Sequence, residues 1–162
     1  MTGGSNKRVS LAALICVKPG RRPRLIYRVH RGRRRGKDQR KGFTETDYAR
    51  LLDAAHQQLA GPLVLVWDNL NAHVSGAMAE LVAARDWLTV YQLPPYAHEL
   101  NPVELVWSHL KRSLADLAKR NLSQLTALVK TRLRRMQYRP GLLDGFLAST
   151  RLDLTPFCNP QH

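Results

Sequence analysis

Leu63-Val64-Leu65-Val66-Trp67 is a run of five apolar residues, and the carboxylate of Asp68 follows it directly. A continuous apolar run of this length is typical of a strand that is covered on both faces. Gly61-Pro62 stands immediately before the run and separates it from the preceding segment. The pattern therefore predicts a buried strand over residues 63–67 that places Asp68 at its C-terminal end.

Strands and helices are predicted to alternate along most of the chain. Apolar runs over residues 9–17 and 24–30 are separated by Pro19-Gly20, which predicts an antiparallel hairpin. Residues 88–91 are expected to form a further short strand. The alternation predicts an α/β fold with a mixed sheet flanked by helices. Apolar residues at helical spacing predict helices over residues 45–60, 75–85, 101–117 and 123–137.

Polar residues mark the expected helix starts. Thr44, Ser75 and Asn101 each precede one of these helices and are predicted to cap it. Asp47 stands three residues after Thr44, which is the acidic position of a capping box. From about residue 140, Pro-Gly and Asn-Pro pairs predict a loosely held tail.

The charge of the chain is strongly positive and unevenly distributed. The 162 residues include 26 Lys and Arg against 12 Asp and Glu, a net charge of +14. Residues 18–41 hold twelve of the basic residues and residues 111–139 hold nine, whereas residues 51–110 hold one basic residue and six acids. This excess favours a polyanion as partner, because each neutralised phosphate releases condensed counterions. The alternative is a surface whose charge serves only solubility.

Composition excludes several classes of protein. No apolar run approaches the roughly 20 residues that a membrane-spanning helix needs. The N-terminal residues lack the apolar stretch of a secretory signal, and two cysteines cannot form a disulfide framework or a Cys-rich zinc site. We therefore expect no membrane partner and a cytoplasmic location.

Asp68 and Glu104 are the strongest candidates for chemistry. Asp68 follows a predicted strand and Glu104 lies in the first turn of a predicted helix, and such element ends carry the sites of open α/β sheets. Carboxylates are hard oxygen ligands that suit Mg²⁺ or Mn²⁺. Two such ions would activate a nucleophile and stabilise the leaving oxygen of a phosphodiester.

Each candidate also has a purely structural interpretation. Glu104 stands three residues after Asn101 and could complete a capping box. Asp68 with Asn69 could end a strand in a turn, and His73 could be an ordinary polar loop residue. An NTPase is excluded, because the chain contains no GxxxxGK[ST] phosphate-binding loop.

Two stretches resemble the second and third acidic motifs of DDE transposases, in particular the bacterial insertion-sequence branch related to the mariner superfamily. The first is LVWDNLNAH, residues 65–73, and the second is LPPYAHELNPVELVW, residues 93–107. The resemblance extends from about Lys7 to Leu117. His98 departs from the family pattern, which usually has a proline at that position.

The resemblance implies a ribonuclease-H-like fold and divalent-metal cutting and joining of DNA at transposon ends. Asp68 would be the second catalytic acid and Glu104 the third, and both would bind Mg²⁺ or Mn²⁺, with two ions expected in a complete site. Asn69, His73 and Asn101 would support them.

The resemblance also implies that one strand is missing. In that family the first catalytic Asp lies on a strand ahead of the one that matches residues 9–17, whereas this chain has no acid before Asp38. Residues 1–120 would then be a catalytic domain without its first, central strand, whose neighbours are left unpaired or wrongly paired. Residues 121–162 would be a C-terminal helix and tail. An upstream part of the same transposase, reached by frameshifting, would complete the enzyme, which would act as a homodimer.

Basic residues are expected to contact the DNA phosphates. The candidates are Arg33, Arg34, Arg35, Lys37, Arg40 and Lys41 in a basic loop, and Lys111 and Arg112 in a helix. Two alternatives stay open: a basic DNA-binding module without chemistry, and an inactive remnant of a transposase.

Overall fold

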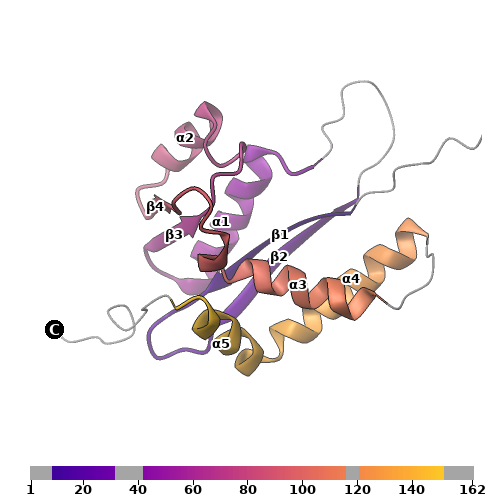
Figure 1. Ribbon diagram of the computed structural model, residues 1–162. Helices are drawn as coiled ribbons and strands as arrows, with labels where there is room; N and C mark the ends of the chain where they lie inside the picture. The colour runs from indigo at the N-terminus through magenta and orange to yellow at the C-terminus, as the bar shows by residue number, and fades with distance from the viewer. Residues whose placement is uncertain (1–8, 32–41, 116–120, 152–162) are drawn as a thin grey trace, which may run out of the picture.

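The computed structural model describes residues 9–31, 42–115 and 121–151. Figure 1 shows an opening hairpin, a second pair of strands and five helices, and this order confirms the predicted elements as far as α4. A short 3-10 helix, η1 (His98–Leu100), precedes α3. The strands are β1 (Val9–Cys16), β2 (Arg24–Arg31), β3 (Leu63–Trp67) and β4 (Leu88–Gln92). The helices are α1 (Glu45–Leu59), α2 (Gly76–Ala83), α3 (Val103–Leu114), α4 (Leu122–Gln137) and α5 (Pro140–Ser149).

β1 and β2 form the predicted antiparallel hairpin, with a register that runs from Val9 opposite Arg31 to Cys16 opposite Arg24. Its two faces lie in different cores, because alternate side chains of a strand point to opposite sides. Leu11, Ala13 and Ile15 pack against α3, α4 and α5, whereas Ala12 and Cys16 pack against α1. Burial raises the pKa of the Cys16 thiol to about 11. Both faces of β1 are therefore covered.

β3 and β4 form a separate parallel pair, in which Leu63 lies opposite Leu88 and Trp67 lies opposite Gln92. Leu65 and Trp67 point inward and pack with Leu52 of α1 and Met78 of α2. On the other face, three large hydrophobic side chains are exposed: Val64 by 55%, Val66 by 47% and Tyr91 by 60%. The prediction that β3 is buried on both faces is therefore wrong, because no described element covers its outer face.

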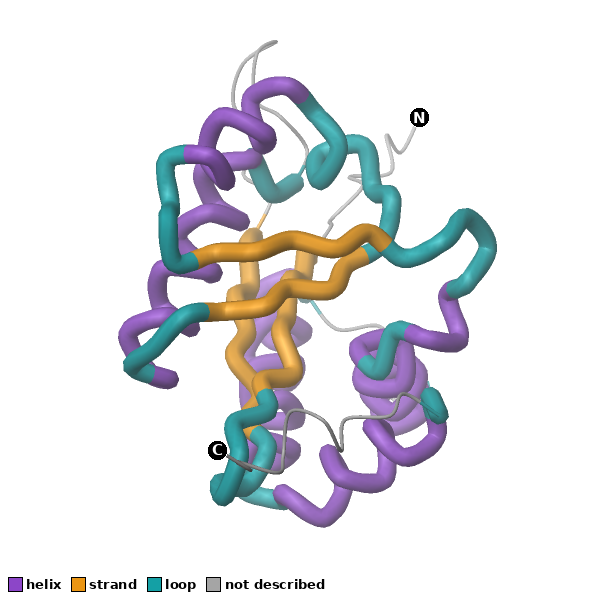
Figure 2. The backbone as a smooth tube through the Cα atoms, turned by 90° about the vertical axis from the view of Figure 1, so that its left-hand side faces the viewer, coloured by secondary structure: helices purple, strands orange, loops and turns teal. Residues whose placement is uncertain are grey.

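The four strands do not join into one sheet. Each described strand has a single hydrogen-bonded neighbour, so β1–β2 and β3–β4 are two separate sheets. Figure 2 shows the β3–β4 pair crossing in front of the β1–β2 pair. The fold is a mixed α/β arrangement of small sheets flanked by helices, and it is consistent with a ribonuclease-H-like fold that lacks a full sheet.

The helix caps follow the sequence closely. Thr44 accepts from the Asp47 N–H, and the Asp47 carboxylate accepts from the Thr44 N–H at 2.9 Å, which confirms the capping box of α1. The Ser75 hydroxyl oxygen accepts from the Met78 N–H at the start of α2. At α3 the prediction is only partly right: the N-cap is Pro102, which makes no side-chain capping bond, although Asn101 Oδ1 accepts from the Val103 N–H at 3.1 Å. These bonds satisfy N–H groups that have no partner inside the helix.

Residues 140–149 are not a loosely held tail. Pro140 begins α5 and suits its first turn, because the N–H that proline lacks would be unpaired there anyway. Leu143 is fully buried and Phe146 nearly so, in one core with Val106 and Leu133. The predicted loose tail is wrong over this range, and residues 152–162 lie outside the described part. Among the described helices, none is both long and apolar enough to cross a bilayer.

A bidentate ion pair ties α1 to the segment between α2 and β4. Arg85 Nε and Nη2 donate to the two carboxylate oxygens of Asp53 at 2.6 and 2.9 Å. The hydrogen bonds from Arg85 lower the pKa of Asp53. A lowered pKa contributes stability that is present above the pKa of the unfolded chain and is lost as pH falls through the pKa of the folded state.

We expect Asp53→Asn to lower the free energy of unfolding at pH 7 by less than about 1 kcal/mol, because the Asp53 carboxylate is partly exposed. The difference from the unmodified chain should shrink as pH falls through the pKa of Asp53. Urea unfolding at pH 7 and pH 3 measures it, with Asp86→Asn, at an exposed neighbouring acid, as control. If Asp53→Asn lowered the free energy of unfolding equally at both pH values, the ion pair between Asp53 and Arg85 would not be the cause.

Candidate active site

The C-terminal ends of β3 and β4 meet at one edge. The strands are parallel and Trp67 lies opposite Gln92, so Asp68 and Leu93 leave the sheet side by side. The Leu93 N–H donates to the Trp67 carbonyl at 2.8 Å and continues the pairing by one residue. The predicted position of Asp68 at a strand end is confirmed.

Asp68 is held from within its own loop. Its Oδ1 accepts from the Leu70 N–H at 3.2 Å and lies 3.0 Å from His73 Nδ1. The hydrogen bond from Leu70 forms the turn that the alternative interpretation of Asp68 predicts. Oδ2 accepts no hydrogen bond from the residues that the structure describes, and the side chain is 29% exposed. One carboxylate oxygen therefore orients the side chain while the other is free to bind a ligand.

His73 is more than an ordinary loop residue. Its ring stacks on Trp67, with centroids 4.2 Å apart and planes 4° apart, and meets Tyr48 of α1 edge-on at 5.0 Å. Its side chain is only 12% exposed, and Nδ1 also lies 3.2 Å from the Asp68 carbonyl oxygen. The aromatic contacts fix the plane of the imidazole, which directs Nδ1 at Asp68.

Sequence reasoning missed the roles of Tyr48 and Trp67 in this arrangement. Burial raises the pKa of the Tyr48 hydroxyl, and the negative charges of Asp68, Asp47 and Glu45 add to the effect. The Trp67 indole N–H is buried without a hydrogen-bond partner in the described residues. The only signal in the sequence was the position of Trp67 directly before Asp68.

Asn69 joins the two loops at this edge. Its side-chain Nδ2 donates to the Leu93 carbonyl at 2.9 Å, across 24 positions of sequence. Leu93 begins the segment that leads through η1 to α3 and Glu104. The hydrogen bond thus ties the loop that carries Asp68 to the segment that carries the second candidate acid.

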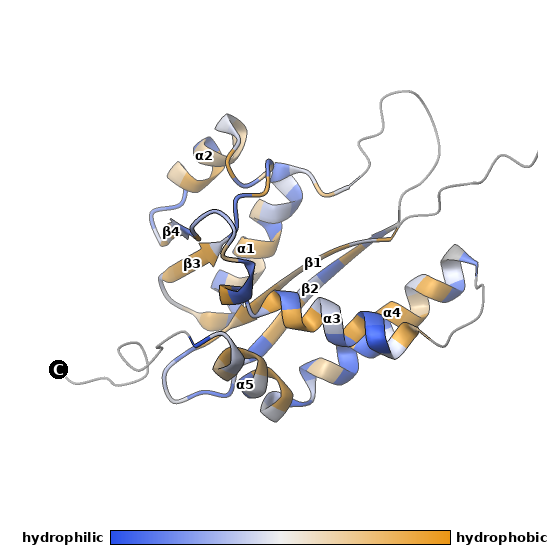
Figure 3. Ribbon diagram, in the orientation of Figure 1, coloured by the Kyte–Doolittle hydropathy of each residue, from blue (hydrophilic) through white to orange (hydrophobic). Residues whose placement is uncertain are grey.

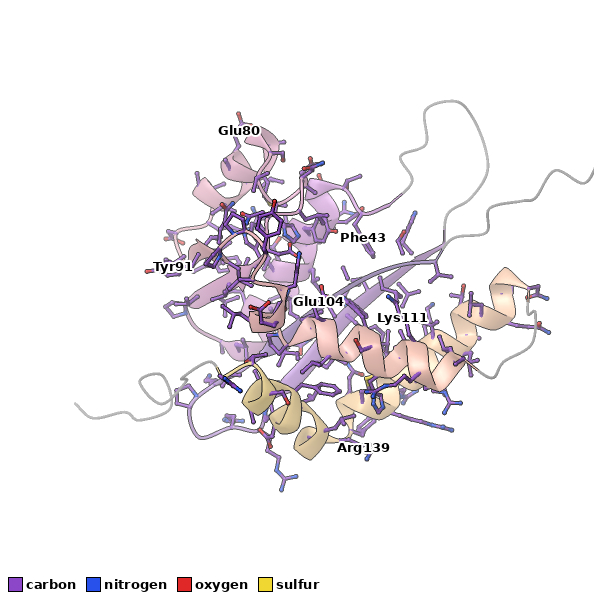
Figure 4. All side chains as sticks on the ribbon, in the orientation of Figure 1. Phe43, Glu80, Tyr91, Glu104, Lys111 and Arg139 are labelled. Atoms are coloured by element: carbon purple, nitrogen blue, oxygen red, sulfur yellow. The ribbon has the colours of Figure 1, made fainter. Side chains whose placement is uncertain are left out.

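Glu104 lies in the first turn of α3 and its side chain is exposed. Its alternative interpretation as part of a capping box is wrong, because the Asn101 N–H donates instead to the His98 carbonyl at 3.0 Å. Figure 4 shows Glu104 at the beginning of α3. Its carboxylate makes no hydrogen bond or ion pair with the described residues.

The structure brings some of the candidate residues together and not others. Asp68, Asn69 and His73 form one connected group at the carboxyl edge of β3. No hydrogen bond or ion pair joins Asp68 to Glu104, and the described residues contain no cluster of three or more His, Cys, Asp or Glu that could hold a metal. The free oxygens of Asp68 and Glu104 have the chemistry that Mg²⁺ or Mn²⁺ prefers, but two carboxylates are few for two ions.

The basic candidates fall into two groups. Lys111 and Arg112 are exposed in the last turn of α3. The others lie outside the described residues: Arg33, Arg34, Arg35, Lys37, Arg40 and Lys41.

Comparison with known protein families matches residues 2–128 to the family described as DDE superfamily endonuclease. The match covers most of the chain and includes β1 to β4, Asp68 and Glu104. The chain belongs to the DDE endonuclease superfamily. A search of curated proteins found no match.

Membership gives the site its chemical context. A DDE endonuclease domain acts on DNA, and members of the superfamily typically use divalent metal ions. The strongly positive charge of this DDE domain suits such a substrate. The edge with Asp68 and the start of α3 with Glu104 both lie inside the matched region.

We expect His73→Phe to lower the free energy of unfolding of the DDE domain by about 1 kcal/mol, which is typical of one lost hydrogen bond. The phenyl ring keeps the contacts with Trp67 and Tyr48 but removes the Nδ1 contact with Asp68. Urea unfolding measures the loss, with Asn71→Ala, at an exposed position in the same loop, as control. Equal stability of His73→Phe and the unmodified chain would show that the Asp68 contact contributes nothing.

Proposed function

We propose that the chain is the catalytic region of a DDE transposase that cleaves DNA and transfers strands at transposon ends, from the bacterial insertion-sequence branch related to the mariner superfamily. Asp68 is the second catalytic acid and Glu104 the third. The observation that carries this proposal is the position of Asp68 at the joint edge of β3 and β4, with one oxygen engaged and one free. Glu104 offers a second free carboxylate, at the start of α3.

Each residue has a distinct part in this function. Bound Mg²⁺ or Mn²⁺ would supply Lewis-acid activation of the attacking oxygen and stabilise the leaving oxygen. Asp68 and Glu104 would hold the ions, with two ions expected in the complete site. His73 orients Asp68, and Asn69 keeps the Asp68 loop against the Leu93 segment. Asn101 accepts a hydrogen bond from Val103, the first residue of the helix on which Glu104 lies.

The division into two sheets supports the proposal that this catalytic region is incomplete. β1 and β3 each have one edge without a described partner. A strand that pairs with both would have to bring the two pairs, which cross in Figure 2, into one sheet. The outer face of β3, which no described element covers, would still need a layer packed on it. The exposure of Val64 and Val66 marks that uncovered face. We propose that an upstream segment of the same transposase supplies this strand together with the first catalytic Asp, and that the complete enzyme is a homodimer.

Nicking of supercoiled DNA tests the function. The chain is joined to the strand encoded upstream, which is expected to be apolar and to end in Asp. This completed domain should nick DNA with Mg²⁺ or Mn²⁺ and not with EDTA. DNA binding without nicking would favour a basic module that performs no chemistry. An upstream sequence that encodes no such strand in any frame would favour an inactive remnant.

A further inference from the structure

The surface formed by α3 and α4 is rich in basic residues. The last turn of α3 carries Lys111 and Arg112, and the last turn of α4 carries Arg134 and Arg135. Arg139 follows α4. All five are exposed. Figure 4 labels Lys111 and Arg139 on this side of the molecule, and Figure 3 shows the end of α3 in strongly hydrophilic colours.

The charges come from different elements but lie close together. α3 and α4 pack against each other through Val106, Leu110, Val129 and Leu133. His109 of α3 contacts the Phe146 ring edge-on at 5.9 Å. Burial lowers the pKa of His109, and the charges of Arg112 and Arg139 lower it further. Two guanidinium groups from separate elements therefore lie near one imidazole.

No acid neutralises this surface within the described residues. Between Glu104 of α3 and Asp144 of α5, which flank this stretch, the described residues contain no Asp or Glu. None of the five basic side chains has an ion-pair partner among the residues that the structure describes. A cation in the last turn of a helix stabilises the fold by only about 0.3–1 kcal/mol through the helix dipole. This effect does not explain Arg139, which lies beyond the end of α4.

The basic residues of α4 have no part in the core. Val129, Leu133 and Met136 form its buried face, and Arg134 and Arg135 lie on the opposite side. Tyr138 follows them and is 74% exposed. An exposed aromatic ring among unpaired arginines is typical of a surface that binds a ligand with both charge and an apolar part, as nucleic acids have.

We propose that the α3–α4 basic face, formed by Lys111, Arg112, Arg134, Arg135, Tyr138 and Arg139, binds the phosphate backbone of duplex DNA. Four of its five cations are arginines, whose planar fork matches a phosphate with two parallel hydrogen bonds. The inference shares with the proposed function that DNA is the ligand. It needs neither Asp68, Glu104 nor a metal ion, so the two can fail separately.

The test is binding of the full chain to a fluorescent duplex in EDTA at several salt concentrations. The triple variant Arg134→Ala, Arg135→Ala, Arg139→Ala should lower the slope of log affinity against log salt by about 2.7, which is about 0.9 for each lost phosphate contact. The matched control is Arg21→Ala, Arg22→Ala, Arg50→Ala, which removes three exposed arginines from the turn of the β1–β2 hairpin and from α1. The control should change the slope by less than about 1, one contact at most.

A charge-preserving variant guards against misfolding. Arg134→Lys, Arg135→Lys, Arg139→Lys should keep most of the salt slope and bind more weakly than the unmodified chain. Equal slopes for the alanine triple and its control would overturn the proposal. A polyglutamate peptide of the same charge as the duplex is the second ligand. If it binds the chain as tightly as the duplex, and the alanine triple weakens both equally, the proposal is also overturned, because the face would then suit an acidic protein. If Asp68→Asn abolishes nicking by the completed domain and leaves DNA binding unchanged, the result supports the role of the acid and agrees with a basic face that binds DNA separately from the active site.

Discussion

Asp68→Asn and Glu104→Gln will each lower the rate of metal-dependent nicking by the completed domain by about 1,000-fold. A metal clamp supplies several kcal/mol of transition-state stabilisation, and about 1.4 kcal/mol corresponds to a factor of ten in rate. Each amide keeps the size of the side chain but removes its negative charge. The measurement is single-turnover nicking of plasmid DNA in Mg²⁺ and in Mn²⁺.

Two controls separate loss of chemistry from loss of structure. Glu99→Gln removes an exposed acid in η1, between β4 and α3, and should leave nicking unchanged. DNA binding by the two active-site variants should stay close to that of the unmodified domain. Full nicking by Asp68→Asn or by Glu104→Gln would remove that residue from the site. Loss in Glu99→Gln as well would point to a general effect of the net charge.

Leu143→Ala will lower the free energy of unfolding by about 3 kcal/mol. Truncating a fully buried leucine removes its apolar contacts and also leaves a cavity. Leu143 is 0% exposed and lies on α5, packed into the core that α5 shares with α3 and α4. Urea unfolding monitored by far-UV circular dichroism measures the change.

Leu147→Ala is the matched control for this prediction. Leu147 lies one turn later on α5 and is only partly buried, so its loss should cost less than about 1.5 kcal/mol. A loss below about 0.5 kcal/mol for Leu143→Ala, as is usual for surface positions, would restore the interpretation of residues 140–149 as a loose tail. The result therefore decides whether α5 belongs to the cooperative unit.

The local elements could be predicted because their signals are local. Helix starts depend on bonds between residues two or three positions apart, as between Thr44 and Asp47. The β1–β2 hairpin depends on a turn between two neighbouring runs. The same local reasoning failed at Pro140-Gly141, which begins a helix here, because a proline also suits the first helical turn.

The site was predicted only in part. The position of Asp68 at a strand end follows from the apolar run before it. Its contact with His73 depends on Trp67 and Tyr48, and Tyr48 comes from α1, twenty residues earlier in the chain. The sequence could not distinguish a free Glu104 carboxylate from one that caps α3. The answer depends on whether the Asn101 N–H donates to another acceptor, and in the structure it donates to the His98 carbonyl.

The sequence by itself determined the types and order of the strands and α-helices up to α4, the caps of α1 and α2, the charge distribution and, through its two acidic motifs, the superfamily. Tertiary structure decided the pairing of the strands into two sheets, the exposure of Val64 and Val66, the burial of Leu143 and the approach of Arg112 and Arg139 to His109. The physical reason is distance along the chain: periodicity and capping act within a few residues, whereas burial and strand pairing depend on partners tens of residues away.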